Sequence, residues 1–431
     1  MGGRTVSGGA ARSLTDPSVV LVRLALAWAL GGGFSLGLLA LALRQGWLHW
    51  PLPWPVLAQL HGQVQTLGFL LLFVVGVAAR LFPPLLATTL PQPGRVTAGG
   101  VLLALGLLLR LVAQPILTLP GRPVWLAASA LLPLVALGLL VTGFWPLVRR
   151  AVVWESWLVF PALGVLSLAA SLGLHGWAGV VLAGGTAVVP APLDRATVDL
   201  ALWGFPVLVA FGVSARILPR FLHLRPASQP LALAGGGLYT LGLLSLALSA
   251  LGPPAVGAGG RLAMVAGLLA FLAGLRLYEP PVRSSGAPQI TEPSRRWLRW
   301  TYLWLPGGSL LLAAEALTGP ATLPHAGAAA RHAVGQGFLL LLIVVIGARI
   351  LPGFAPFMTS RPRLLTALAT LGSAGALLRV LGELLRLRPL ADLALALGAG
   401  LSTLGFAVFA VLLWPRLTPV RRAAPADRPR P

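Results

Sequence analysis

The sequence contains no cysteine and no lysine, and charged residues of either sign are scarce. Because cysteine is absent, disulfides, thiolate metal sites and iron–sulfur clusters are excluded. Only 10% of the 431 residues are charged, whereas about a quarter of the residues of a soluble protein are charged. The chain therefore lacks the polar groups that would cover a water-exposed surface, and lipid must be its main solvent.

Long apolar runs stand where a soluble chain would carry charge. Hydrophobic residues make up 57% of the sequence, and the mean hydropathy is +0.87. Runs of about 20 apolar residues, each long enough to cross a bilayer core of roughly 30 Å, recur from end to end. We therefore predict an all-α polytopic membrane protein with twelve transmembrane helices. The predicted spans are 19–43, 55–79, 97–118, 124–148, 154–175, 196–218, 230–251, 257–278, 298–318, 329–351, 364–386 and 391–414.

The net charge of +22 comes entirely from arginine. The arginines lie in short loops rather than in a basic patch with interleaved aromatics, so we expect no nucleic-acid partner. The N-terminal tail, the even-numbered loops and the C-terminal tail carry 22 arginines, whereas the odd-numbered loops and their edges carry seven. The positive-inside rule then predicts a multi-pass protein of the bacterial inner (cytoplasmic) membrane with both termini in the cytoplasm.

The two ends of the chain differ from the rest in composition. Residues 1–18 form a polar tail, and the apolar span after it has no A-x-A cleavage site, so we expect an uncleaved first helix. Residues 415–431 are rich in proline, alanine and arginine and are predicted to be disordered.

A motif recurs three times, as "LGFLLLFVVGVAARLFPPL" (67–85), "WGFPVLVAFGVSARILPRF" (203–221) and "QGFLLLLIVVIGARILPGF" (336–354). One apolar helix ending in arginine and proline would only mark the inner interface and the helix stop. Three copies in one register indicate an internal repeat. We predict three four-helix units, 19–150, 151–292 and 293–414, about a pseudo-threefold axis. The matching triplets are Gly68/Arg80/Pro83, Gly204/Arg216/Pro219 and Gly337/Arg349/Pro352.

Two histidines open repeat-related helices at similar depth. His61 lies 19 residues before Arg80, and His332 lies 17 residues before Arg349, which places both roughly 26–28 Å above the arginines. Each has a glutamine four residues later, Gln65 and Gln336, on the same helix face. Such histidines can be interfacial residues with the ring in the headgroup region. The sharper interpretation is a facing pair of imidazoles that holds a haem iron.

The repeat aligns further polar residues with these histidines. Gln63, Asp199 and His332 lie five residues before the repeated Gly-Phe and would line one polar pocket. Asp199 is either a buried partner of Arg195 or Arg331, or a residue that orients a histidine. Charge inside a membrane span is rare and often functional. The charged residues noted within spans are Arg23, Arg110, Asp199, Glu315 and Arg379.

The remaining histidines give a weaker signal for a second metal. His175 is predicted to end the fifth span, and His49 and His325 fall in outer loops. Three imidazoles could bind copper, but loops fix no spacing between them. We therefore do not expect copper.

The short motifs resemble those of a known family. "HGQVQTLGF", "SARILPRF" and "HAVGQG" are similar to segments of the NnrS family, membrane haem and copper proteins associated with nitric oxide and denitrification. The overall layout is distantly similar to subunit I of haem–copper oxidases, where histidines on the second and tenth helices hold a low-spin haem. Gln63 stands where the family usually has a second histidine, and the copper ligands of an oxidase have no counterpart. Oxygen reduction to water is therefore not expected.

The resemblance implies an integral membrane haem-b protein of NnrS type, acting in nitric oxide handling, denitrification or electron transfer. His61 and His332 would be the axial ligands and Gln65 and Gln336 would line the haem edge. Arg331 and Arg195 would neutralise the propionates. The expected partners of the protein are the lipid bilayer and redox partners or other membrane subunits. The residues leave two alternatives open, a structural subunit without cofactor and a proton-coupled transporter using Asp199 and Glu315. The sequence identifies no catalytic residue.

Overall fold

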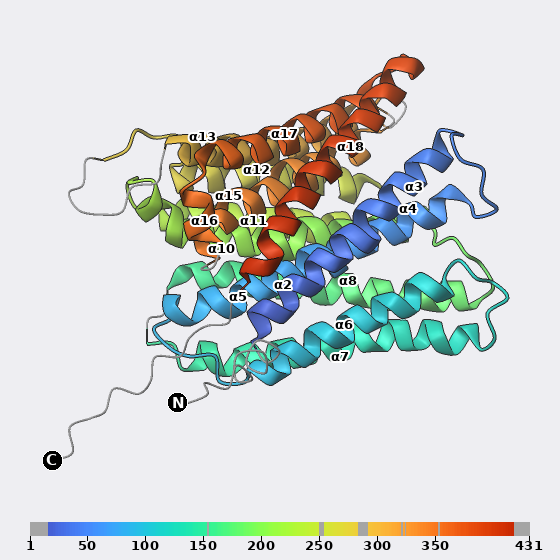
Figure 1. Ribbon diagram of the computed structural model, residues 1–431, viewed down its shortest axis with the longest axis horizontal. Helices are drawn as coiled ribbons and strands as arrows, with labels where there is room; N and C mark the ends of the chain where they lie inside the picture. The colour runs from blue at the N-terminus through green and yellow to red at the C-terminus, as the bar shows by residue number, and fades with distance from the viewer. Residues whose placement is uncertain are drawn as a thin grey trace, which may run out of the picture.

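The chain folds into a bundle of long helices in a computed structural model (Figure 1). The structure describes residues 16–152, 155–249, 254–282, 292–319, 322–323, 325–351 and 354–417, and within these ranges it contains no β-strand. Most of the predicted tails 1–18 and 415–431 lies outside the described residues. Pro352 of the third repeat also lies outside them. The all-α membrane class is confirmed. The three-unit boundaries remain a prediction.

Every predicted span falls on a helix. In chain order the elements are α2 (Pro17–Trp28), η1 (Ala29–Phe34), α3 (Ser35–Arg44), α4 (Trp54–Gln63), η2 (Val64–Leu71), α5 (Leu72–Leu85), α6 (Pro93–Ala113), α7 (Arg122–Arg149), η3 (Ser156–Leu158), α8 (Val159–Ala183), α9 (Ala191–Asp199), η4 (Leu200–Gly204), α10 (Phe205–Phe221), α11 (Gln229–Leu248), α12 (Pro254–Leu275), α13 (Glu292–Thr318), α14 (Ala326–His332), η5 (Ala333–Leu340), α15 (Leu341–Ile350), α16 (Ala355–Thr359), α17 (Pro362–Leu384), α18 (Arg388–Leu413) and η6 (Trp414–Arg416).

Eleven of these helices, in the described part of the chain, are long and apolar enough to cross a membrane. The predicted span 298–318 forms α13 but is not among the eleven. Its first turns carry Arg295, Arg296 and Arg299, and Glu315 lies near its end, so its apolar stretch is short. The count of twelve spans therefore remains a prediction.

Three helices form the interior of the bundle. Ala191–Phe221 is the most buried of the eleven candidate spans, and Trp54–Leu85 and Ala326–Ile350 follow it. These three inner helices are the ones that carry the repeated motif. Each contains a π-helical segment, and η4 contacts both η2 and η5. The repeat-related helices therefore meet one another in the centre.

The π-helical segments share the register of the repeat. η2, η4 and η5 each begin four residues before the repeated glycine, at Val64, Leu200 and Ala333. At each glycine a side chain of the preceding long helix occupies the place of a Cβ. Added Cβ atoms would lie 3.2 Å from Trp28 at Gly68, 2.5 Å from Ser167 at Gly204 and 2.3 Å from Trp304 at Gly337. Since π segments often occur at functional sites, this shared geometry directs attention to the residues just before them.

Three close helix pairs cover the inner helices: α6 with α7, α11 with α12, and α17 with α18 (Figure 1). Glycines bring the paired backbones together. An added Cβ at Gly267 would lie 2.3 Å from the Tyr239 nitrogen, and one at Gly398 would lie 2.6 Å from the Arg379 nitrogen. Small residues are typical of helix contacts in membranes. Lipid tails are as apolar as the side chains, so helices associate there through close packing and not through the hydrophobic effect.

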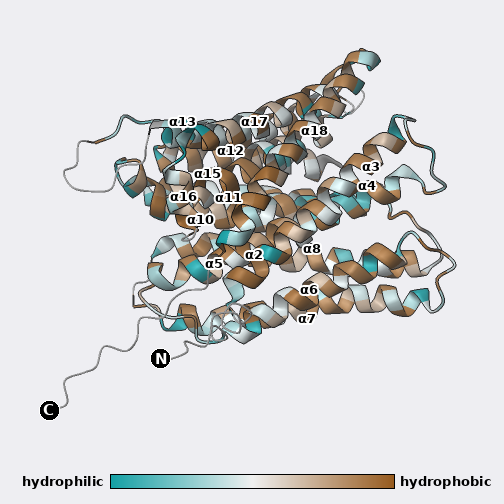
Figure 2. Ribbon diagram, viewed as in Figure 1, coloured by the Kyte–Doolittle hydropathy of each residue, from teal (hydrophilic) through white to brown (hydrophobic). Residues whose placement is uncertain are grey.

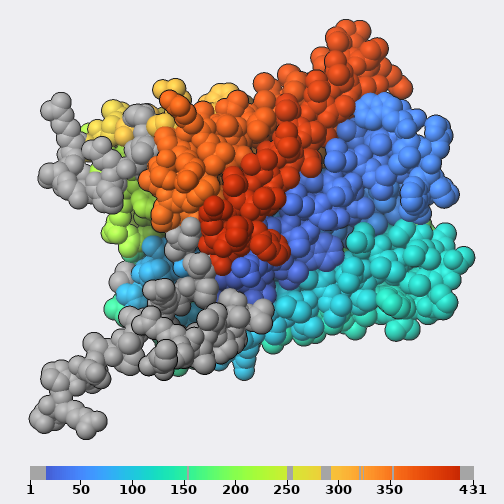
Figure 3. All heavy atoms as spheres, in the orientation of Figure 1, coloured from blue at the N-terminus to red at the C-terminus, as the bar shows by residue number. Residues whose placement is uncertain are grey.

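The outward faces suit contact with lipid. Leu131, Val180 and Val411 are each more than half exposed, and brown, hydrophobic residues dominate the outer helices in Figure 2. The last helix closes the bundle against the first. α18 contacts α3, and the two lie side by side on the face shown in Figure 3.

The end of the fifth span was predicted wrongly. His175 was expected to end the fifth span, but α8 continues to Ala183 and His175 is fully buried within it. The residues after His175, "GWAGVVLA", are apolar enough to continue the helix. His175 is therefore an interior residue of the bundle and not a loop ligand.

The packing of Trp304 on Gly337 gives a stability prediction. We expect Gly337→Ala to lower the free energy of unfolding by about 1–3 kcal/mol, the usual range for overpacking, because the new methyl group overlaps the indole. Thermal unfolding of purified protein in detergent measures the change. Gly307→Ala on α13, where no atom lies within 4 Å of an added Cβ, is the matched control and should be neutral or stabilising. Equal stability of the two variants would contradict the packing.

Candidate functional site

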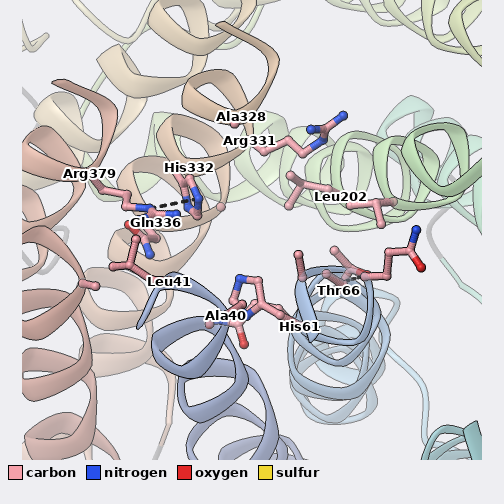
Figure 4. A pocket seen from close by; sticks show the side chains of 18 of the residues that line it. Ala40, Leu41, His61, Thr66, Leu202, Ala328, Arg331, His332, Gln336 and Arg379 are labelled. Carbon is pink, nitrogen blue, oxygen red and sulfur yellow. Dashed lines mark hydrogen bonds between the residues drawn. The ribbon is translucent and has the colours of Figure 1, made fainter. Parts of the chain in front are cut away.

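A cavity of about 480 Å³ opens between the inner helices and α3, α17 and α18. It brings together the six residues proposed from sequence to bind haem. Those residues are His61, Gln65, Arg195, Arg331, His332 and Gln336. In Figure 4, His332, Gln336 and Arg379 gather on one side of the cavity, and His61 projects from the helix across from them. The i, i+4 pairs predicted to share a helix face therefore do line one space.

His61 is held by a backbone carbonyl of the first long helix. Its Nδ1 lies 2.7 Å from the Gly33 carbonyl oxygen in η1. Because a carbonyl can only accept, Nδ1 carries the proton and Nε2 keeps its lone pair. Gly37 makes room for the ring, since a Cβ there would lie 2.8 Å from Cε1. The two glycines of this helix thus fix both the orientation and the tautomer of His61.

His332 is held by an arginine from α17. The Nε of Arg379 donates to His332 Nε2 at 3.1 Å, the dashed line in Figure 4. Arg379 also forms an ion pair with Glu383, 3.1 Å between Nη2 and Oε1. Glu383 in turn pairs with Arg44 at the end of α3, at 3.2 Å. A continuous chain of polar contacts therefore leads from Arg44 to the imidazole of His332.

Asp199 has an arginine partner. Arg331 donates to its two carboxylate oxygens from Nε and Nη2, at 2.7 and 3.3 Å. Of the alternatives for Asp199, this geometry matches the buried partner of Arg331, and neither Arg195 nor a histidine is bonded to it among the described contacts. The pair joins α9 to α14 and fixes the position of Arg331, the residue next to His332.

The glutamines present unused acceptors. The side-chain oxygens of Gln65 and Gln336 are buried and accept no hydrogen bond from any residue that the structure describes. Leaving a buried acceptor unsatisfied costs about 1–3 kcal/mol, so these oxygens favour a ligand with donors or polar edges. Gln63 is buried as well, but it does not line the cavity.

The other histidines do not assemble into a metal site. His325 lines the cavity, His49 is exposed in the α3–α4 loop, and His175 lies inside α8. Within the described ranges no group of three or more His, Asp or Glu side chains is placed to hold a metal ion. The three histidines considered for copper therefore do not converge.

The volume of the cavity and the side chains that line it are compatible with a haem. Its volume falls within the range of about 300–1,000 Å³ that is common for cofactor sites. Histidines that bind metal usually donate their second ring nitrogen to a carbonyl or carboxylate, as His61 does to Gly33. Cationic side chains at the cavity, including Arg195, Arg331 and Arg44, match the two propionates of a haem. The residues present thus fit the group.

Sequence reasoning missed part of this site. Arg379 was noted only as a charge within a span, and Glu383 was overlooked although it lies in the same predicted span, 364–386. Four residues separate them, which is the spacing of neighbours on one helix face. An acid four residues after a buried arginine was the signal that could have found this contact.

A second hollow of about 600 Å³ adjoins the cavity. The two share Arg44, His325 and Glu383 as lining residues. Arg386 and Arg388 also line the second hollow. The Arg44–Glu383 ion pair therefore lines both this second hollow and the cavity that contains the histidines.

Comparison with protein families identifies a relationship. The family model described as NnrS protein matches residues 135–421, more than half of the chain. The matched region includes Asp199, Arg331 and His332 and begins after His61. Comparison with individual curated proteins finds no match.

The Asp199–Arg331 pair gives a second stability prediction. We expect Asp199→Ala to cost about 1–3 kcal/mol of unfolding free energy, between the values for exposed and fully buried pairs, since it leaves Arg331 inside the bundle without that partner. Glu279→Ala breaks a more exposed pair with Arg276 and should cost under about 1 kcal/mol. Thermal or denaturant unfolding compares the two. A loss no larger than that of the control contradicts a structural role for the pair.

Proposed function

The chain belongs to the NnrS family, and from that premise we propose that it is an integral membrane protein that binds a b-type haem in the cavity. His61 and His332 are the proposed axial ligands. The observation that carries this proposal is that helices far apart in the sequence bring both imidazoles to one cavity of cofactor size.

The tautomer of His61 suits metal binding. The Nδ1–H donates a hydrogen bond to the Gly33 carbonyl, so the lone pair of Nε2 is available without any change of tautomer. The hydrogen bond also holds the ring against rotation. His61 is therefore the ligand whose geometry needs the least adjustment.

His332 carries its lone pair on Nε2 as well, since that atom accepts from Arg379. To bind iron through Nε2 it must lose this hydrogen bond. Arg379 can turn away and keep its ion pair with Glu383. Binding of iron by His332 Nε2 would therefore require Arg379 to move off that atom.

The other lining residues provide the rest of a haem site. Apolar side chains such as Phe34, Phe69 and Leu340 suit the faces of a porphyrin and exclude water from it. Arg195 and Arg331 line the cavity and would neutralise the propionates, and Gln65 and Gln336 lie a turn beyond the histidines.

When bound, such a haem supplies one-electron chemistry and an iron that binds small molecules such as nitric oxide. We propose a role in nitric oxide handling, denitrification or electron transfer, in line with the resemblance of the motifs. The protein residues contribute binding, orientation and exclusion of water, and redox partners or other membrane subunits would exchange electrons with the site.

We further propose that the histidine end of the bundle faces away from the cytoplasm of a bacterial cell. The arginine-rich connections lie at the opposite end of the inner helices, and the positive-inside rule assigns them to the cytoplasm. The cavity then lies near the outer surface of the inner membrane.

The orientation can be tested directly because the chain has no cysteine. His49→Cys and Thr89→Cys place single thiols in exposed positions of the α3–α4 and α5–α6 loops. We expect a membrane-impermeant maleimide to label the first variant in intact spheroplasts and the second only after lysis. The reverse pattern of labelling would show that the proposed orientation is wrong.

The haem proposal predicts a spectrum. Wild-type protein from a haem-sufficient host should show the reduced absorption bands of a low-spin b-type haem. His61→Ala should lose the haem or convert it to high spin, and so should His332→Ala, while both variants still insert and migrate as wild type in size-exclusion chromatography. His49→Ala, which removes an exposed loop histidine, is the control and should leave the spectrum unchanged.

Two results would contradict the proposal. A wild-type protein that purifies colourless from such a host has no haem, and the cofactor-free alternatives then take its place. An unchanged spectrum in both histidine variants would show that other residues bind the iron.

A further inference from the structure

Arg379 contacts the one atom of His332 that the haem proposal requires. Its Nε donates to His332 Nε2 at 3.1 Å. We propose that Arg379 is a positioning residue that competes with iron for His332 and so sets how readily this histidine leaves the iron. The inference rests on the proposed haem site.

The competition follows from the chemistry of imidazole. A neutral ring has one nitrogen with a proton and one with a lone pair. The Nε2 lone pair of His332 can accept a hydrogen bond or bind a metal, and it cannot do both. Any bond that stabilises the first state therefore weakens the second by the same free energy.

Arg379 is firmly anchored in its position. Its side chain is 13% exposed, and that of Glu383, its ion-pair partner, is 1% exposed. Its backbone lies against α18, where Gly398 permits the close approach. The guanidinium therefore stays beside His332 whether or not it donates to the ring.

Arg379 also has a spare donor. Its Nη1 is buried and has no hydrogen-bond partner among the described residues, while Nη2 binds Glu383. The guanidinium can thus rotate off His332 and remain paired with the carboxylate. This gives two arrangements of the same residues, one with His332 bonded to Arg379 and one with Nε2 free.

The two arrangements have different consequences for a bound haem. With His332 free, both histidines can bind the iron, which suits electron transfer. With His332 held by Arg379, only His61 would bind iron through Nε2, and the iron would keep a position for a small ligand. Through Arg379 the site could thus exchange His332 for a diatomic ligand on the iron.

Carbon monoxide binding to the reduced protein measures this exchange, because carbon monoxide needs the position that His332 vacates. Arg379→Met removes the donor at similar side-chain length. We expect it to lower the apparent carbon monoxide affinity about tenfold or more, since a hydrogen bond to a charged group commonly contributes that much to an equilibrium. The ferric spectrum should stay low-spin.

Two matched variants accompany it. Arg379→Lys keeps a cation that can donate, and its affinity should lie close to that of wild type. Arg363→Met removes an exposed arginine near the start of the same helix and should have no effect.

A double-mutant cycle separates the proposed route from general damage. The cycle uses the fraction of His332→Ala protein that keeps haem on His61. In this background the arginine has no imidazole to hold, so adding Arg379→Met should leave carbon monoxide affinity unchanged. Arg379→Met is compatible with folding because Glu383 keeps its second partner, Arg44. An equal effect of Arg379→Met with and without His332 would overturn the inference.

The outcomes also distinguish this inference from the haem proposal. If the purified protein contains no haem, both the haem proposal and this inference are wrong. Haem bound by His61 and His332 together with an unchanged carbon monoxide affinity in Arg379→Met leaves the proposed function in place and contradicts the competition alone.

Discussion

The site depends on the close approach of three inner helices. Each has a glycine where a side chain from the preceding long helix enters, and each widens into a π-helical segment that begins four residues before that glycine. Without a Cβ at Gly68 and Gly337, Trp28 and Trp304 can pack closely against the helices that carry the histidines. Since protein interiors tolerate little overlap, these glycines determine where His61 and His332 stand.

The histidine chemistry depends in turn on which groups hold the rings. A carbonyl from η1 holds His61, and an arginine from α17 holds His332. The first partner leaves Nε2 free, whereas the second occupies it. The two histidines therefore lie at similar depth but differ in how easily they can bind a metal. This asymmetry links the packing of the bundle to the proposed exchange of ligands.

Much of the site could be predicted because its signals are local. The Gly-Phe register marked the three inner helices, and the i, i+4 spacing placed Gln65 and Gln336 on the faces of the histidines. The remaining contacts are tertiary. Two contacts, the pairing of Asp199 with Arg331 rather than Arg195 and the bond from Arg379 to His332, depend on how separate helices are oriented against one another. Helical spacing alone does not contain that information, and it also misplaced His175, because the apolar residues after it extend α8.

The nitrogen ligands of the iron test the central claim most directly. Hyperfine spectroscopy of the oxidised protein labelled with ¹⁵N-histidine counts the histidine nitrogens coupled to one low-spin ferric haem. The account predicts two such nitrogens in the wild type, with His61→Ala and His332→Ala each removing one. Coupling to two histidine nitrogens that persists in both single variants would show that the iron is held elsewhere.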